Sequence, residues 1–174
     1  MASYTCRINI YLPLNNDLTP DTDNVGHFDI QILKSSVSLM NKTYSNPHIS
    51  YGGEGVTITN GSDFTLGSKC MRCYMPFTVT DDDITTLDNN WLKRYCATSS
   101  TNTYDVTSGD FKTYRKERYN CFGAAAQWCH LMGYSTLKSI YDRYTNDGDG
   151  YKNYIPWAMF NTYHMAWTYA ALRT

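Results

Sequence analysis

The segment that most constrains the fold is the run from Cys121 to Met132, which carries almost no charged or strongly polar side chain. Gly133 follows it, and glycine is the residue preferred just beyond a helix C-terminus. A helix that is apolar nearly all round belongs in the interior of a protein. Residues 124–126 are all alanine, so the helix backbone can approach a sheet closely. The sequence therefore predicts a central buried helix around which the other elements are arranged.

The first half of the chain alternates as strands do. Residues 6–12 predict a half-buried strand, and residues 26–33 place their apolar side chains on one face and their polar side chains on the other. His27 stands at the start of that second segment, in a position expected to be exposed and near an edge. Further strands are expected at 47–51, 56–59 and 74–79.

After residue 79, the apolar residues recur at the spacing typical of helices. Thr80 and the aspartates after it predict a helix N-terminus, whereas residues 97–109 are rich in Ser, Thr and Asn and predict a loop. Helices are also expected over 136–144 and from Pro156 to Leu172. Strands followed by helices predict an α+β fold in one domain, residues 1–174, with a core of about 6–134 and a C-terminal helical extension, 135–174.

Length and charge exclude several classes of protein. The 174 residues are enough for a hydrophobic core, and a formal net charge of −1 argues against a nucleic-acid binder. The N-terminus lacks the features of a cleaved signal, and no apolar stretch is long enough to span a bilayer. We therefore expect synthesis in the cytoplasm without a cleaved signal and no stable membrane span.

The chain has six cysteines, and free thiols are the expected state because a chain of this length needs no disulfides to fold. In an oxidising compartment, Cys70 and Cys73 would be the first pair to suspect. A single Cys-x-x-Cys supplies only two of the four ligands of a structural zinc site. Residues 146–150 lack the closing glutamate of a calcium loop. No metal and no cofactor are therefore expected.

Cys121 is the candidate nucleophile because it begins the buried helix. The positive end of a helix dipole favours thiolate over thiol, and the basic residues between 112 and 118 are expected to act in the same direction. Asn120 is the expected N-cap. The structural alternative is that Cys121 is an ordinary small core residue.

A cysteine nucleophile needs a base, and His27 is the candidate because it lies on the polar face at a strand start. His130 lies at the wrong end of the cysteine helix, and His164 belongs to the last aromatic segment. His48, on the next strand, is the candidate that orients His27, with Ser50 on the same strand face as the alternative. The structural alternative for His27 is a hydrogen-bonded surface histidine.

The order of these signals resembles the circularly permuted branch of the papain-fold superfamily, in which the histidine precedes the cysteine. That branch includes permuted NlpC-type peptidases, PPPDE peptidases and lecithin–retinol-acyltransferase-like enzymes. The long segment between Cys96 and Tyr119 departs from the pattern, and residues 135–174 lie outside the resemblance. The matching segments are Gly26-His27, Tyr51-Gly52, Val79-Thr80-Asp81-Asp82-Asp83-Ile84 and Tyr119-Asn120-Cys121-Phe122 with Gly133.

The resemblance implies a permuted papain-like domain and thiol hydrolysis of an amide bond. Cys121 would attack the carbonyl, His27 would move the proton, and His48 would orient His27. The implied setting is a peptidoglycan or peptide substrate, cleaved by an antibacterial effector that a specialised secretion system exports and an immunity protein neutralises. The alternatives are a deconjugating peptidase, an acyltransferase or lipid hydrolase, and a binding module without activity.

Overall fold

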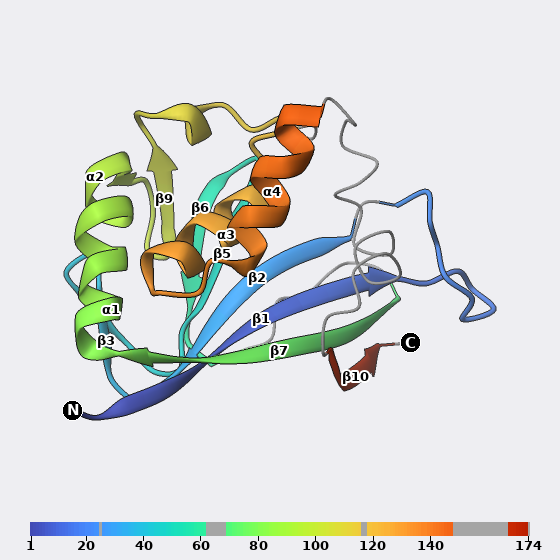
Figure 1. The fold of residues 1–174 in the computed structure, drawn as a ribbon, viewed down its shortest axis with the longest axis horizontal. Helices are drawn as coiled ribbons and strands as arrows, with labels where there is room; N and C mark the ends of the chain where they lie inside the picture. The colour runs from blue at the N-terminus through green and yellow to red at the C-terminus, as the bar shows by residue number, and fades with distance from the viewer. Residues whose placement is uncertain (25, 62–68, 116–117, 148–166, 174) are drawn as a thin grey trace.

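The computed structural model describes residues 1–24, 26–61, 69–115, 118–147 and 167–173. Within these ranges the chain is a mixed α+β protein, in which an antiparallel sheet packs against a few helices (Figure 1). The sheet order is β10-β7-β1-β2-β5-β6-β9-β8, and a separate hairpin is made by β3 and β4. The strands are β1 (Ser3–Pro13), β2 (His27–Leu33), β3 (Val37–Leu39), β4 (Lys42–Tyr44), β5 (His48–Gly52), β6 (Gly55–Thr59), β7 (Cys70–Thr80), β8 (Cys96–Thr98), β9 (Thr103–Val106) and β10 (Thr168–Arg173).

The helical segments follow β7 and lie against the sheet (Figure 1). Thr80 forms the predicted cap of α1, and its hydroxyl and the Asp83 carboxylate make a reciprocal capping box. A π-helical turn continues α1 into α2. The helical bounds are α1 (Asp81–Leu87), the π-helical turn (Asp88–Leu92), α2 (Lys93–Tyr95), a 3-10 turn (Asp110–Lys112), α3 (Cys121–Leu131) and α4 (Thr136–Asp147).

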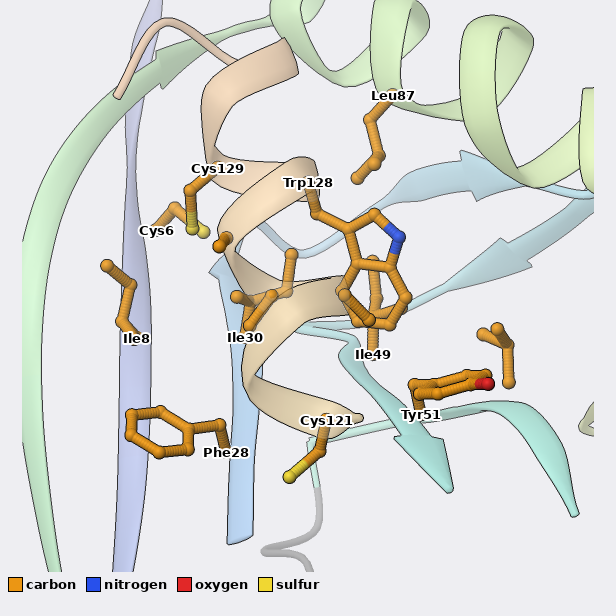
Figure 2. Close-up of a cluster of buried hydrophobic side chains, with 14 of the residues drawn as sticks. Cys6, Ile8, Phe28, Ile30, Ile49, Tyr51, Leu87, Cys121, Trp128 and Cys129 are labelled. Atoms are coloured by element: carbon orange, nitrogen blue, oxygen red, sulfur yellow. The ribbon is translucent and has the colours of Figure 1, made fainter. Parts of the chain in front are cut away.

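Helix α3 is the predicted buried helix, and it packs on the apolar face of β1, β2 and β5 (Figure 2). Its alanines at 124–126 are fully buried, and Phe28 of β2 meets Phe122 with ring centroids 5.0 Å apart. The helix ends as expected. Gly133 has a φ of 90°, and the N–H groups of Gly133 and Tyr134 return to the carbonyls of His130 and Cys129.

The opposite face of the central strands is polar and buried. β2 lies between β1 and β5, so His27 is neither at an edge nor exposed; only 8% of its surface is accessible. The expected exposed position was wrong because the alternating pattern shows which residues share a face, but not whether that face is covered. Asn9 and Asp29 are buried on the same face.

Two other expectations from the sequence are corrected. The segment 97–109 is not all loop, because β8 and β9 pair through Cys96–Val106 and Thr98–Tyr104. The helix expected from Pro156 to Leu172 is wrong at its end, where β10 pairs with β7. Residues 148–166, which include most of that segment and His164, lie outside the described residues. The expected helical extension is therefore helical in α4 and a strand in β10.

Candidate active site

Cys121 is the first residue of α3, as predicted. Asn120 is the N-cap, and its side-chain oxygen accepts from the backbone N–H of Gly123 at 2.9 Å. The backbone N–H groups of Cys121 and Phe122 in the first helical turn, and that of Phe28 in β2, all act to lower the pKa of the thiol. Figure 2 shows the sulfur directed from the helix toward β2. Cys121 thus lies near Phe28, the residue that directly follows His27.

Burial, rather than the helix dipole, dominates the charge state of this thiol. Loss of solvent raises the pKa of Cys121 to about 11, although the three backbone N–H groups act to lower it. Among the described upstream cations, Lys112, Arg115 and Arg118, none is a group that lowers this pKa. The expectation of a thiolate at rest is therefore wrong, and near neutral pH Cys121 is a neutral thiol.

His27 begins β2 on the polar face, where Nε2 lies 2.6 Å from Oγ of Ser50 on β5. Burial lowers the pKa of His27 to about 4, against the opposing pull of Asp29. The imidazole is therefore neutral near pH 7 and has one ring nitrogen with a lone pair. A hydrogen bond from Nε2–H to Ser50 would leave that lone pair on Nδ1. His27 is thus a neutral base on the polar face of the sheet, whereas the neutral thiol of Cys121 belongs to α3 on the apolar face.

Ser50, the alternative that the sequence left open, is the group placed against Nε2 of His27. His48 lies on the same strand face, but two residues away along β5, and its Nδ1 is 3.4 Å from Oδ2 of Asp29. The register explains the difference, because β5 pairs Asp29 with Ser50 and Gln31 with His48. Strand β5 is the expected neighbour of β2, and Ser50 rather than His48 lies at Nε2 of His27, while the orienting role itself stays a prediction.

Asp29 is the residue of this region to which sequence reasoning assigned no role. Its carboxylate is fully buried and accepts hydrogen bonds from Nδ2 of Asn9 at 2.7 Å and from the hydroxyl of Tyr11 at 2.9 Å. The signal in the sequence was the alternation of residues 26–33, which puts Asp29 on the face of His27. Its partners come from β1 through the pairs Asn9–Asp29 and Tyr11–His27, which a single strand cannot reveal.

A cleft has Tyr51 in its wall, but neither Cys121 nor His27 is among the residues that line it. Tyr51 is buried near Cys121 (Figure 2), and its hydroxyl donates to the carbonyl of Phe111 at 2.8 Å. Beyond Tyr51, a cleft of about 190 Å³ runs between the turn at residues 52–55 and the segment from 105 to 114. Its walls carry both apolar rings and charged side chains, which suits a polar chain such as a peptide.

In the part of the chain that the structure describes, no cluster of His, Cys, Asp and Glu side chains is arranged to hold a metal ion. All six cysteines lie in that part; each is buried and none is in a disulfide. No described helix combines the length and apolar character needed to cross a bilayer. Comparison with protein-family models, with curated proteins and with solved structures finds no match to this chain.

Proposed function

We propose that the protein is a cysteine-dependent hydrolase that cleaves an amide bond, with a permuted papain-like arrangement of its site. The observation that carries this proposal is the position of the Cys121 thiol at the start of α3, where the backbone N–H of Phe28, the residue after His27, acts to lower its pKa. Ser50 supports the same reading, because it gives the imidazole a fixed partner on the next strand. A nucleophile, a base and an orienting group thus come from three separate elements.

The first chemical step is a proton transfer coupled to attack. The Cys121 thiol gives its proton to neutral His27, and the sulfur forms a bond to the substrate carbonyl carbon, whose π electrons move onto oxygen. When the tetrahedral intermediate collapses, the C–N bond breaks and the leaving amine takes the proton back from His27. Water then hydrolyses the thioester with His27 as base, which frees the carboxylic acid and restores the thiol.

Backbone N–H groups at the start of α3 favour negative charge near the sulfur. The N–H groups of Cys121 and Phe122 both act to lower the pKa of the thiol. We propose that the Cys121 N–H also stabilises the oxyanion, whose charge develops next to the attacking sulfur. This contribution does not depend on a depressed pKa of the thiol at rest, because the helix end acts on the charge only as it appears.

The proposed substrate is the peptide part of peptidoglycan, and the proposed setting is an antibacterial effector that an immunity protein neutralises in the producing cell. The cleft beside Tyr51 supports a peptide substrate, because charged and aromatic side chains line the same short channel. A specialised export route follows from that setting. The same site chemistry would also serve a deconjugating peptidase.

The nucleophile is tested by thiol alkylation. Each cysteine is followed by mass spectrometry after brief exposure to iodoacetamide near pH 7. Cys121 should react fastest, and His27→Ala should slow it by at least tenfold, because the neutral thiol then lacks its base. Cys129→Ala is the matched control in the same helix, and it should leave the Cys121 rate unchanged. Equal reactivity of Cys121 in the parent and in His27→Ala would make it an ordinary buried thiol in a binding module.

The substrate is tested by incubating the full chain with purified peptidoglycan and identifying the released fragments by mass spectrometry. Cleaved peptide stems are expected from the parent protein and none from Cys121→Ala, because alanine fits an Ala-rich helix and removes only the sulfur. A panel of isopeptide and ester substrates is run in parallel. Cleavage only in that panel would move the proposal to a deconjugating peptidase or a lipid hydrolase.

A further inference from the structure

We propose that Asp29 is a positioning residue for His27, and that its buried carboxylate stabilises the positive charge that His27 gains on accepting the thiol proton. The inference rests on the proposed function and extends it to a residue outside the Cys121, His27 and Ser50 set. The burial of His27 makes such a stabilising group necessary. A base surrounded by protein must hold a proton during each turnover, although burial disfavours its charged form.

The structure surrounds Asp29 with neutral donors. None of its surface is accessible, and Asn9 and Tyr11 donate to its two oxygens at 2.7 and 2.9 Å. A carboxylate at such a depth persists only if it is well hydrogen-bonded, which these donors achieve. Because both donors are uncharged, they stabilise the negative charge without cancelling it. The carboxylate therefore acts on other groups along the polar face.

His27 is on that face and on the same strand. The two residues are separated by one position in β2, which places their side chains about 7 Å apart along the strand. Both are buried, so solvent screens the interaction much less than at the surface. Asp29 raises the pKa of His27 and opposes the effect of burial, which still lowers it to about 4. The position of Asp29 on the face of His27 and its effect on the pKa of His27 both support stabilisation of the protonated imidazole by Asp29.

The charged and titratable groups around Asp29 come from four elements. Tyr11 of β1 has its pKa raised by burial and by Asp29, and Arg72 of β7 acts on the same hydroxyl. His48 of β5 places its Nδ1 3.4 Å from Oδ2 of Asp29. Cys121 of α3 also feels Asp29, which contributes to its raised pKa. Asp29 therefore favours a neutral thiol at rest and a protonated imidazole after the transfer.

The test measures His27 directly rather than through hydrolysis. In full-length protein carrying Cys121→Ala, so that the thiol does not titrate, the imidazole of His27 is followed by NMR between pH 3 and 7. With Asp29 present, His27 should be about half protonated near pH 4. Asp29→Asn keeps the shape and removes the charge, and it should lower the measured pKa by about one unit, a tenfold change in the protonation equilibrium.

Tyr11→Phe is the matched control, because it removes a donor to Asp29 and keeps both the carboxylate and the ring beside His27. It should leave the pKa of His27 unchanged or higher. If Tyr11→Phe lowered the pKa of His27 as much as Asp29→Asn does, any disturbance of the buried polar face would have this effect. That result would overturn the proposal. So would an unchanged pKa in Asp29→Asn. If that variant does not fold, Tyr11→Phe decides: a maintained or raised pKa supports the role, and a lowered one overturns it.

The two proposals fail separately. Asp29→Asn can lower the pKa of His27 in a protein that cleaves no peptidoglycan, and then the electrostatic coupling stands while the proposed substrate fails. Conversely, cleavage that depends on Cys121 together with an unchanged pKa in Asp29→Asn would retain the hydrolase and remove Asp29 from its site.

Discussion

At the scale of single residues, two opposing forces meet at Cys121. The start of a helix favours a thiolate by a fraction of a unit charge spread over a few N–H groups, whereas transfer from water to the protein interior penalises the full charge. Only 6% of the cysteine is exposed, and the penalty is the larger of the two, so its pKa is raised to about 11.

The serine beside the imidazole provides the residue-scale prediction. Ser50→Ala removes the Oγ that lies 2.6 Å from Nε2 of His27 and should slow alkylation of Cys121 about tenfold, as expected for one lost hydrogen bond of roughly 1.4 kcal/mol. Ser50→Thr keeps a hydroxyl and should retain most of the rate. His48→Ala should slow the reaction less, because His48 lies beside Asp29. A larger effect of His48→Ala than of Ser50→Ala would return the orienting role to the histidine.

The sequence identified Cys121 at a helix start and its cap, Asn120, because both are encoded by local pattern. It also narrowed the orienting group to one strand face. It did not distinguish Ser50 from His48, because that choice depends on the pairing register of β2 and β5. The charge state of Cys121 was wrong for a related reason: burial is set by chain segments far away in sequence.

At the scale of elements, α3 is positioned by contacts at its first turn. Tyr141 of α4 lies across Gly123, and the Tyr141 hydroxyl donates to the carbonyl of Arg118 at 2.7 Å. A Cβ added at Gly123 would lie 2.7 Å from Cε2 of the Tyr141 ring and 3.1 Å from the Arg118 oxygen. Helix α4 thus fixes the end of α3 that presents Cys121.

Gly123→Ala should therefore destabilise the protein even though alanine is the better helix former. The gain in helix propensity is about 1 kcal/mol, whereas forcing a methyl group against the Tyr141 ring costs up to roughly 3 kcal/mol. Urea denaturation should show a net loss of about 1–2 kcal/mol. Gly53→Ala is the control, because nothing lies within 4 Å of its added Cβ. Increased stability of Gly123→Ala would show that α4 yields easily at this contact.

Elements with long or strongly patterned sequences were predicted well, and short ones were not. The strands β1, β2, β5, β6 and β7 and the helices α1, α3 and α4 were all expected near their observed positions. The short strands β8 and β9 were missed because each has only three or four residues and lies in a segment rich in Ser, Thr and Asn, although Tyr104 and Val106 favour strands. β10 was missed because its alternation is weak and its strand state depends on pairing with β7.

At the scale of the whole molecule, the buried His27 links folding to pH. Its pKa is about 4 in the folded protein and about 6.5 in an unfolded chain, so the unfolded chain binds more protons between those values. The free energy of unfolding should therefore fall as the pH drops from 6.5 to 4, by roughly 3 kcal/mol from this residue. Denaturation with urea at pH 4.5, 5.5 and 7 measures the slope.

His27→Gln supplies the reference for that measurement, because it has no titrating ring. Its stability should depend less on pH in this window, whatever its value at pH 7. The exposed aspartates with lowered pKa values, Asp17 and Asp21, act below their ordinary pKa of 3.8 and so contribute little there. An identical slope in the parent and in His27→Gln would mean that His27 is more accessible to water than the fold indicates.

The pairing of β1 has a consequence for the order in which the chain is made. β1 is flanked by β2 on one side and on the other by β7, with partners that run from Ser3–Thr80 to Pro13–Cys70. A ribosome adding roughly 5–20 residues per second needs about 4–15 s to reach Thr80 after Ser3. During that interval β1 and β2 can pair, but the outer edge of β1 is without its native neighbour. We therefore expect aggregation and chaperone binding to be strongest during synthesis, while the outer edge of β1 is exposed and β7 has not yet been made.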